Sequence, residues 1–346
     1  MLAGVLFIVR RYTVDGGMEK YVWELTHSLA SKGVSVHILC EYSDICLDDR
    51  IEIHKVTPSF PKPRWVAMVK FSSRAFKWLK KHPHNKWIVH SHERSSFHHV
   101  TTFHGPPFAN VYKKPWWKRV SLRTKVWLFL EKRELCANNV QFILPNSEYI
   151  SDQLSSYYPC INNRMLSPAF PAVHKNDKTF KKDRNIIVFI GREWKRKGLK
   201  KAVAIVQAIK KTNRNIKFLV VGPEKREIRH LFKSWDGGYE LLGWSDSQPI
   251  LERAGLLLHP AKMEPYGMAI AEASNLGTRV VISDQCGIAS KVNANSGQVI
   301  GIDSSINIWA SACLDELSNQ KQAETIGNSW DELAEEHISL YQKIKL

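Results

Sequence analysis

The feature that most constrains the fold is an alternation of short apolar strands and amphipathic helices that runs through the chain twice. The first run starts with an expected strand at Leu2–Val9 and a helix that ends at Gly33. The second run starts with an expected strand at Asn185–Ile190 and a helix over Leu199–Lys211. Such alternation is typical of parallel sheets covered by helices. We therefore predict the α/β class, with two doubly wound, Rossmann-like domains and a ligand site in the cleft between them, beyond the carboxyl ends of the strands.

The other expected elements follow the same pattern. In the first block the sequence predicts strands at 34–40, 87–91, 101–104 and 140–145, and helices at 65–81 and 116–136. In the second block it predicts strands at 216–221, 255–259 and 279–283, helices at 225–235 and 266–276, and closing helices at 306–317 and about 323–345. The best linker candidate is the Pro-rich, then basic, segment 167–184. This division gives an N-terminal domain at 1–166 and a C-terminal domain at 185–324, with a last helix at about 325–346 that is expected to pack back on the first domain.

The charge of the chain indicates an anionic partner. The 346 residues carry a formal net charge of +17. Lys and Arg outnumber Asp and Glu by 24 to 13 in residues 1–166 and by 15 to 3 in residues 167–217, whereas acids prevail by 17 to 11 in residues 218–346. The segment Pro61–Lys86 holds eight basic residues and no acid. A field of this sign favours a phosphorylated ligand, an acidic membrane or a nucleic acid, although no nucleic-acid-binding module is recognisable.

Two segments combine tryptophan with basic residues, Pro63–Lys81 and Lys113–Arg133. Basic amphipathic helices that contain Trp are typical of membrane surfaces. The alternative is a helix that packs on a core and exposes a solvated basic face. Apolar runs are far shorter than the roughly 20 residues of a membrane-spanning helix, and the start of the chain is not a convincing signal peptide. Six cysteines without CxxC spacing suit reduced thiols in a cytoplasm.

Two glutamates in the stretch MEPYGMAIAEASNLG, Glu264 and Glu272, suggest a binding role. On one helix they would be roughly 12 Å apart along the axis, too far for the carboxylate pair of a glycoside hydrolase, which needs about 5–9.5 Å. Because Pro265 disfavours helix at the residue before it, we expect Glu264 in a loop and Glu272 about two turns into the helix. The pair suits the two ends of an extended ligand. An ordinary amphipathic helix is the alternative.

Other motifs fall where an expected strand meets a helix. Arg192 and Lys197 follow Gly191, a position that suits a phosphate at a helix N-terminus, although a solvated basic loop is equally compatible. Gly16 and Gly17 allow close approach of a ligand or form a plain turn. His104 precedes Gly105 at a strand end, as a catalytic or a structural histidine.

The histidine-rich stretch VHSHERSSFHHVTTFHG leaves a metal site open, because His90 and His92 alternate at a strand end. No CxxC accompanies these histidines, and the chain has no Asp-x-Asp pair of the kind that metal-dependent nucleotide-sugar enzymes carry. We therefore expect no metal and no cofactor.

These pieces resemble retaining glycosyltransferases of the GT-B fold, in the "group 1" or family 4 class. The matching stretches cover most of the chain in the family's order: GGMEKYVWELTHSLASKGVSVHIL, VHSHE, TTFHG, PNSEYI, GREWKRKGLKKAV, VVGPE, LLGWSD and EPYGMAIAEASNLGTRVVISD. Within the class the sequence is most similar to enzymes that extend lipopolysaccharide core or O-antigen.

The resemblance implies a role for each matching residue. Glu264 would contact hydroxyls of the donor sugar, and Glu272 would hold the nucleotide ribose. Arg192 and Lys197 would bind the diphosphate, and His104 would lie beside the transferring carbon. The remaining donor-binding positions would be Gly16, Gly17, Gly222, Tyr266 and Gly267.

The resemblance also implies a reaction and its partners. The chain would be a metal-independent hexosyltransferase that uses a nucleotide sugar, UDP-glucose before GDP-mannose. The acceptor would be an anionic glycolipid or lipopolysaccharide precursor, met by a cytoplasmic enzyme that is peripheral at the inner membrane. A soluble acceptor and a catalytically silent GT-B binding protein stay open as alternatives.

Overall fold

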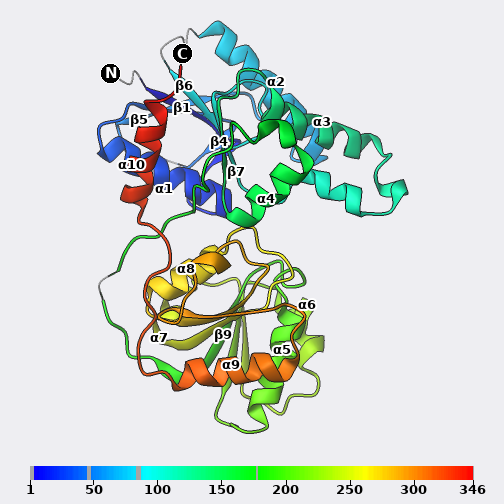
Figure 1. Cartoon of the computed structure of the whole chain (residues 1–346), viewed down its shortest axis with the longest axis vertical. Coiled ribbons are helices and arrows are strands. Elements are labelled where there is room, and N and C mark those ends of the chain that lie inside the picture. The colour runs from blue at the N-terminus through cyan, green and yellow to red at the C-terminus, as the bar shows by residue number, and fades with distance from the viewer. Residues whose placement is uncertain (1–3, 45–47, 83–86, 177, 346) are drawn as a thin grey trace. The chain divides into compact units, whose positions relative to one another are not determined.

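A computed structural model describes residues 4–44, 48–82, 87–176 and 178–345. Residues 2–3 of the first expected strand lie outside the described residues. The chain divides into two compact units, which are shown in Figure 1 and are described separately below. Unit 1 comprises Met1–Ala172 and Asn328–Leu346, and unit 2 comprises Val173–Gly327. The chain thus passes into unit 2 inside the segment expected to be a linker, and its last helix belongs to unit 1.

Unit 1 is built on a parallel six-stranded sheet with the order β5-β3-β1-β6-β7-β8. Its strands are β1 (Val5–Ile8), β3 (Val36–Cys40), β5 (Ile51–Lys55), β6 (Ile88–Ser91), β7 (Val100–Phe103) and β8 (Phe142–Pro145), beside a small pair of β2 (Arg11–Tyr12) and β4 (Tyr42–Ser43). Its helices are α1 (Gly17–Ser31), α2 (Arg64–Lys81), α3 (Leu122–Cys136), α4 (Glu148–Tyr157) and α10 (Trp330–Tyr341). Helices α2 and α3 cover one face, where Phe71 and Leu130 pack against Leu6 and Ile8.

Unit 2 repeats the design with the order β11-β10-β9-β12-β13-β14. Its strands are β9 (Asp183–Ile190), β10 (Lys217–Val221), β11 (Tyr239–Gly243), β12 (Ala254–His259), β13 (Arg279–Ser283) and β14 (Gly297–Ile300). Its helices are α5 (Leu199–Lys210), α6 (Lys225–Ile228), α7 (Gln248–Arg253), α8 (Met268–Asn275) and α9 (Ile306–Ser318). Helices α5 and α9 cover one face, where Ile205 and Trp309 are buried with Phe189 in one cluster.

Both six-stranded sheets have the strand order 3-2-1-4-5-6 of a Rossmann fold, counted in chain order within each sheet. The predicted α/β class with two doubly wound domains is therefore confirmed. In such a sheet the strand order reverses between the first and fourth strands, and ligands bind beyond the carboxyl ends of these strands. The places to examine are the loops after β1 and β6 in unit 1, and those after β9 and β12 in unit 2.

Several predicted boundaries were wrong for local reasons. The helix expected over 116–136 begins at Leu122, because the Ser121 side chain accepts the Thr124 N–H as an N-cap, and Trp116–Lys118 is a 3₁₀ turn. The last helix is limited to α10 by a capping box between Ser329 and Glu332. The helix expected over 225–235 is α-helical only in α6 and continues as a 3₁₀ turn over Arg229–Phe232.

Among the described residues, three strands of the six-stranded sheets, the small pair β2 and β4, and two α-helices were not predicted. Strands β5, β11 and β14 are short edge or outer strands without a continuous apolar run, and α4 and α7 are short helices. These elements form because a neighbouring strand or a packed core supplies their partners, which a local pattern does not reveal.

Candidate active site

Glycines bring two loops of unit 2 close together at the carboxyl ends of β9 and β10. Gly191 and Gly222 have φ of 152° and 110°, which side-chain-bearing residues rarely adopt. A Cβ at Gly222 would lie 2.9 Å from the Gly191 carbonyl carbon and 3.0 Å from the Arg192 nitrogen. The two loops therefore pass each other backbone to backbone, and Gly222 is required at its position.

A third glycine joins the start of α5 to the loop after β12. Gly198 is the N-cap of α5 with φ of 83°, and a Cβ there would lie 1.8 Å from the Pro260 carbonyl oxygen. Only a glycine fits this contact. It places Lys197, the preceding residue, beside the loop that carries Glu264.

Glu264 lies at the centre of a cluster of basic side chains. Its Oε2 atom is 3.2 Å from Lys197 Nζ, 3.5 Å from Arg196 Nη1 and 3.5 Å from His259 Nε2. The loop is fixed through the backbone as well, because the Glu264 N–H donates to the Gln285 carbonyl oxygen and the Gly287 N–H donates to the Glu264 carbonyl oxygen. The structure thus brings two predicted site residues, Lys197 and Glu264, into one ion pair.

The cluster keeps the Glu264 carboxyl ionised. Burial opposes ionisation, but His259 and the charges of Lys197 and Arg196 outweigh it and lower the Glu264 pKa to about 2. Burial lowers the pKa of His259, although Glu264 opposes this shift. The result is a buried carboxylate with strong acceptor oxygens at the switch point of the unit 2 sheet.

Arg192 remains accessible at the end of β9. Its side chain is exposed, and its guanidinium lies 5.6 Å from the centre of the Trp244 ring in the loop after β11. This cation–π contact holds the arginine along the carboxyl edge of the sheet, where it can contact an anion.

Tyr266, Gly267 and Glu272 lie on the segment after Glu264. Tyr266 is buried, and burial raises the pKa of its hydroxyl. Gly267 is the N-cap of α8 with φ of 123°, so the helix starts at Met268 and not at Tyr266 as expected. The half-buried Glu272 is therefore only the fifth residue of α8, little more than one turn into the helix. Glu264 is in the preceding loop, as Pro265 predicted.

In unit 1 the two neighbouring glycines differ. Gly16 is the N-cap of α1 with φ of 106°, and a Cβ there would meet the Glu19 carboxylate at 2.5 Å. Gly17 begins the helix, and a Cβ there would have no atom within 4 Å among the described residues. Gly16 is needed for the turn, whereas open space adjoins Gly17.

His104 follows β7 and pairs with a second histidine. Its Nε2 atom shares a 2.7 Å hydrogen bond with Nδ1 of His92, which follows β6, and the Tyr21 ring lies edge-on at 4.9 Å. Burial lowers the His104 pKa to about 3, so the ring is neutral at physiological pH. The backbone oxygen of His104 accepts a hydrogen bond from the Asn146 side chain. His90, by contrast, bonds the Tyr341 hydroxyl and the Thr102 hydroxyl and is a structural residue.

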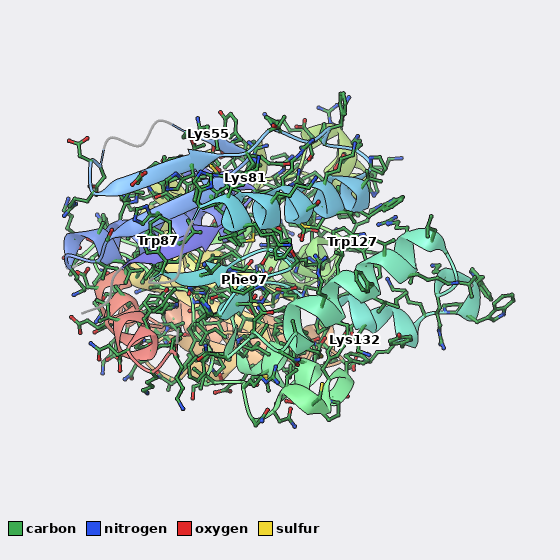
Figure 2. All side chains as sticks on the ribbon, turned by 90° about the horizontal axis from the view of Figure 1, so that it is seen from above. Lys55, Lys81, Trp87, Phe97, Trp127 and Lys132 are labelled. Carbon is green, nitrogen blue, oxygen red and sulfur yellow. The ribbon has the colours of Figure 1, made fainter. Side chains whose placement is uncertain are left out.

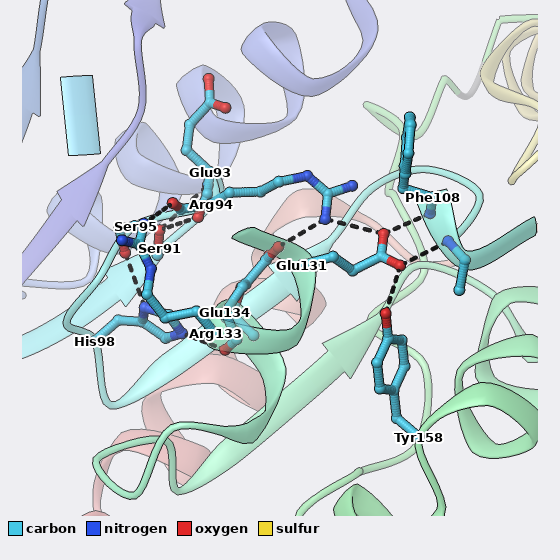
Figure 3. Close-up of polar contacts among 12 residues, drawn as sticks. Ser91, Glu93, Arg94, Ser95, His98, Phe108, Glu131, Arg133, Glu134 and Tyr158 are labelled. Atoms are coloured by element: carbon cyan, nitrogen blue, oxygen red, sulfur yellow. Dashed lines mark hydrogen bonds and ion pairs between the residues drawn. The ribbon is translucent and has the colours of Figure 1, made fainter. Parts of the chain in front are cut away.

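Glu131 of α3 anchors the loop that follows His104, and Glu134 lies beside it (Figure 3). The buried Glu131 carboxylate accepts the backbone N–H groups of Phe108 and Ala109 and the Tyr158 hydroxyl. Arg94 lies between the two acids, 2.9 Å from Glu131 and 3.4 Å from Glu134. Burial raises the Glu134 pKa to about 7, against the nearby Arg94 charge. This network fixes the backbone just beyond His104.

Sequence reasoning missed three residues near the predicted ones, Arg196, His259 and Glu93, and considered His92 only as a possible metal ligand. Arg196 is one of several basic residues in its loop, so the sequence did not distinguish it. No motif surrounds His259 at the end of β12. Glu93 follows β6 and accepts the Arg10 N–H, and burial raises its pKa to about 7 in spite of Arg10. The histidine-rich stretch was itself the available signal for His92 and Glu93.

Comparison with known proteins agrees with this architecture. Residues 15–165 match the family model described as Glycosyltransferase Family 4, and residues 172–331 match the model described as Glycosyl transferases group 1. Together with the fold, these matches define the class: the chain belongs to the GT-B glycosyltransferases.

Within that class the chain is similar to the lipopolysaccharide glucosyltransferase WaaG of Escherichia coli (strain K12). The two are 27% identical over 164 residues, which are 46% of this chain and 41% of that relative, so the match spans less than half of the relative's length. A crystal structure of WaaG superposes with a TM-score of 0.78 at 18% identity, over 97% of this chain and 95% of that one.

Two further structures have the same fold. Sucrose-phosphate synthase from Thermosynechococcus elongatus gives a TM-score of 0.76 at 16% identity, over 98% of both chains. The lipopolysaccharide outer core galactosyltransferase WaaB gives 0.65 at 14% identity, over 99% of this chain and 100% of that one. In the part of the chain that the structure describes, every helix is too short or too polar to cross a membrane.

Proposed function

We propose that this chain is a retaining, metal-independent hexosyltransferase that moves a sugar from a nucleoside diphosphate to a lipid-linked or lipopolysaccharide acceptor. The observation that carries the proposal is the buried Glu264 carboxylate, held beside Lys197 and Arg196 next to the glycine loops of β9 and β10. A ligand with hydroxyls at one end and phosphates at the other suits this arrangement, because the carboxylate can accept the hydroxyls and the cations can bind the phosphates.

In this proposal each side chain has one task. The ion-pair contacts of Glu264 all use Oε2, and Oε1 would accept hydroxyls of the donor sugar. Arg192 and Lys197 would stabilise the charge that develops on the leaving diphosphate, as a metal ion does elsewhere. Tyr266, Gly267 and Glu272 would hold the nucleoside, with Glu272 on the ribose, while Gly222 keeps its loop close to the phosphates.

The unit 1 residues would act on the transferring carbon and the acceptor. The neutral His104 ring would hydrogen-bond the donor sugar, with His92 fixing its orientation. Open space at Gly17 would admit a phosphate or the acceptor, with Gly16 making the turn. Retention would follow from front-face attack, in which the donor phosphate helps to take the acceptor proton.

Similarity and charge support the proposed substrates. The name of the curated relative, a lipopolysaccharide glucosyltransferase, supports glucose as the sugar, from UDP-glucose before GDP-mannose. It also supports a lipopolysaccharide precursor as acceptor. The +17 net charge favours an anionic acceptor at the inner face of a membrane, reached by a cytoplasmic, peripheral protein.

The two segments that combine tryptophan with basic residues differ in how far their apolar side chains are exposed. This difference indicates which of them can contact a membrane. Helix α2 buries its apolar face, including Phe71 and Leu79, against the sheet. The turn before α3 instead leaves Trp116 and Trp117 exposed by 68% and 58%, next to Lys113 and Lys118. Figures 1 and 2 show this part of unit 1 projecting away from its sheet. We propose the 113–133 segment as the membrane-contacting surface.

The first test is thermal stability with UDP, GDP, ADP and CMP, each with and without Mg²⁺. A ligand at about 100 times its dissociation constant adds roughly 2.7 kcal/mol. We expect a shift with UDP that does not depend on Mg²⁺. A shift that requires Mg²⁺ would contradict the metal-independent site, and no shift with any nucleotide would favour the silent GT-B binding protein. Transfer to a small soluble sugar without membranes would instead favour the soluble-acceptor alternative.

A further inference from the structure

Three side chains that commonly bind metals meet on the sheet edge of unit 1. In the parallel pairing of β3 and β5, His37 is opposite Glu52 and Leu39 is opposite His54. Because alternate residues of a strand share a face, His37, Glu52 and His54 all point to the same side. Two tryptophans adjoin them: the Trp87 ring stacks on His37 at 4.1 Å, and the Trp78 ring lies 4.8 Å from that of His54. Figure 2 labels Trp87 and Lys55, the last residue of β5, in this part of unit 1.

The separations of the three groups match those around one tetrahedral metal ion. His37 Nδ1 is 3.3 Å from His54 Nε2 and 3.3 Å from Glu52 Oε2, and His54 Nε2 is 3.5 Å from Glu52 Oε1. Zinc–nitrogen and zinc–oxygen bonds are about 2.0–2.2 Å. Two ligands of a tetrahedral zinc ion are therefore about 3.3–3.6 Å apart, which agrees with the separation of the two histidine nitrogens and with the distance from each of them to its nearer Glu52 oxygen.

The surroundings of His37 favour the tautomer whose Nδ1 lone pair can bind a metal. His37 Nε2 lies 3.2 Å from Ser35 Oγ, and when this nitrogen donates its hydrogen to the serine, Nδ1 carries the lone pair toward Glu52 and His54. Burial lowers the pKa of both His37 and His54, although Glu52 opposes the shift. Burial thus favours the neutral imidazole, which is the form that binds metals.

We propose that His37, Glu52 and His54 bind one divalent transition-metal ion, with Zn²⁺ the best match, and that Ser35 orients His37. Two imidazole nitrogens disfavour Mg²⁺ and Ca²⁺, which prefer oxygen ligands. Glu52 is solvent-exposed, so water can complete the coordination. The site lies on the strands and not in the loops proposed to bind the donor. The bound ion would stabilise the pairing of the edge strand β5 with β3, independently of sugar transfer.

The test is isothermal titration of Zn²⁺ into the metal-free full chain without a histidine tag. We expect one ion per chain, with Mg²⁺ unable to compete. Glu52→Gln and His54→Gln should each weaken binding by tenfold or more, and Ser35→Ala by about tenfold. The matched control is His82→Gln: the His82 ring stacks on Trp78 at 4.1 Å but is not one of the three ligands, so affinity should not change. Substituting Co²⁺ for Zn²⁺ should give the visible absorption of a tetrahedral site.

Three outcomes would overturn the proposal. The first is the absence of saturable binding at one ion per chain. The second is unchanged Zn²⁺ affinity in both Glu52→Gln and His54→Gln, which would show that the stacked, hydrogen-bonded histidines have only a structural role. The third is an equal loss in His82→Gln, which would indicate general attraction by surface histidines. Circular dichroism of each variant verifies folding, and the buried His37 is left intact for this reason.

Discussion

At the scale of single residues, Glu264 combines a structural and a chemical role. It is almost fully buried, yet its carboxylate faces Lys197, Arg196 and His259. Removing one partner of a buried ion pair leaves the other charges uncompensated. A mutation here will therefore affect both stability and the proposed chemistry, and the two effects need separate measurements.

Glu264→Ala should abolish sugar transfer and leave nucleotide binding nearly intact, because the proposed role of this residue is at the sugar end of the donor. Glu272→Ala should weaken nucleotide binding by about tenfold, as expected for the loss of one charged hydrogen bond. Transfer assays and nucleotide titrations measure the two effects. If Glu264→Ala lost nucleotide binding, its placement at the sugar would be wrong, and unchanged affinity in Glu272→Ala would refute the ribose role.

The Glu264 pKa also predicts a pH dependence of stability. Because the folded-state pKa is about 2 and the ordinary value is 4.5, the carboxylate stabilises the fold above pH 4.5, and this contribution disappears as the pH falls toward 2. A shift of that size corresponds to a few kcal/mol. The difference in urea stability between the wild type and Glu264→Gln should therefore shrink between pH 4.5 and 2. A constant difference would show that the cluster does not depress this pKa.

At the scale of elements, helix α3 supports the loop after His104 through Glu131. Glu131→Gln should destabilise unit 1 by about 1–3 kcal/mol, because the hydrogen bonds from the Phe108 and Ala109 N–H groups lose their charged acceptor and the half-buried Arg94 keeps only Glu134 as a partner. Denaturant unfolding measures this change. Asp152→Asn, on the exposed face of α4, is the control and should change stability by less than 0.5 kcal/mol or so. Equal effects of the two substitutions would contradict the anchoring role.

The start of α5 depends on a single residue, Gly198. Gly198→Ala should cost more than about 2 kcal/mol, because a Cβ would collide with the Pro260 carbonyl oxygen at a positive φ. Gly17→Ala, also at a helix start, should cost little stability because its Cβ would meet open space. It should still reduce transfer if a ligand approaches there. Comparable melting temperatures for the two variants would show that the α5 contact tolerates a side chain.

At the scale of the whole molecule, basic charge and exposed tryptophans predict binding to anionic vesicles. The wild-type protein should co-sediment with phosphatidylglycerol vesicles, and less so as salt rises from 50 to about 200 mM. Replacing both Trp116 and Trp117 by serine should reduce the bound fraction several-fold. Trp244→Ser is the control, because this tryptophan is also exposed but lies in unit 2. Undiminished binding of the double variant would exclude the 113–133 segment as the contact.

Much of the architecture could be predicted from the sequence because it depends on local patterns of apolar residues. The first predicted helix is α1, and its apolar side chains Tyr21, Leu25 and Leu29 are buried, as the alternation of strands and amphipathic helices requires. The apolar strand cores at 186–189 and 255–259 are buried in β9 and β12. Helix starts were less predictable, because a serine cap or a glycine at positive φ acts over one residue only.

By itself the sequence determined the alternation of strands and helices, and with it the doubly wound class, because burial on two faces requires continuous apolar strands. It also supplied the residue types of the candidate site. Only the tertiary structure decided which of these side chains meet. Lys197, His259 and Glu264 are brought together by the adjacency of β9 and β12, and His37 meets His54 through the register of β3 and β5. Strand adjacency and register are set by packing between distant segments, which no local pattern encodes.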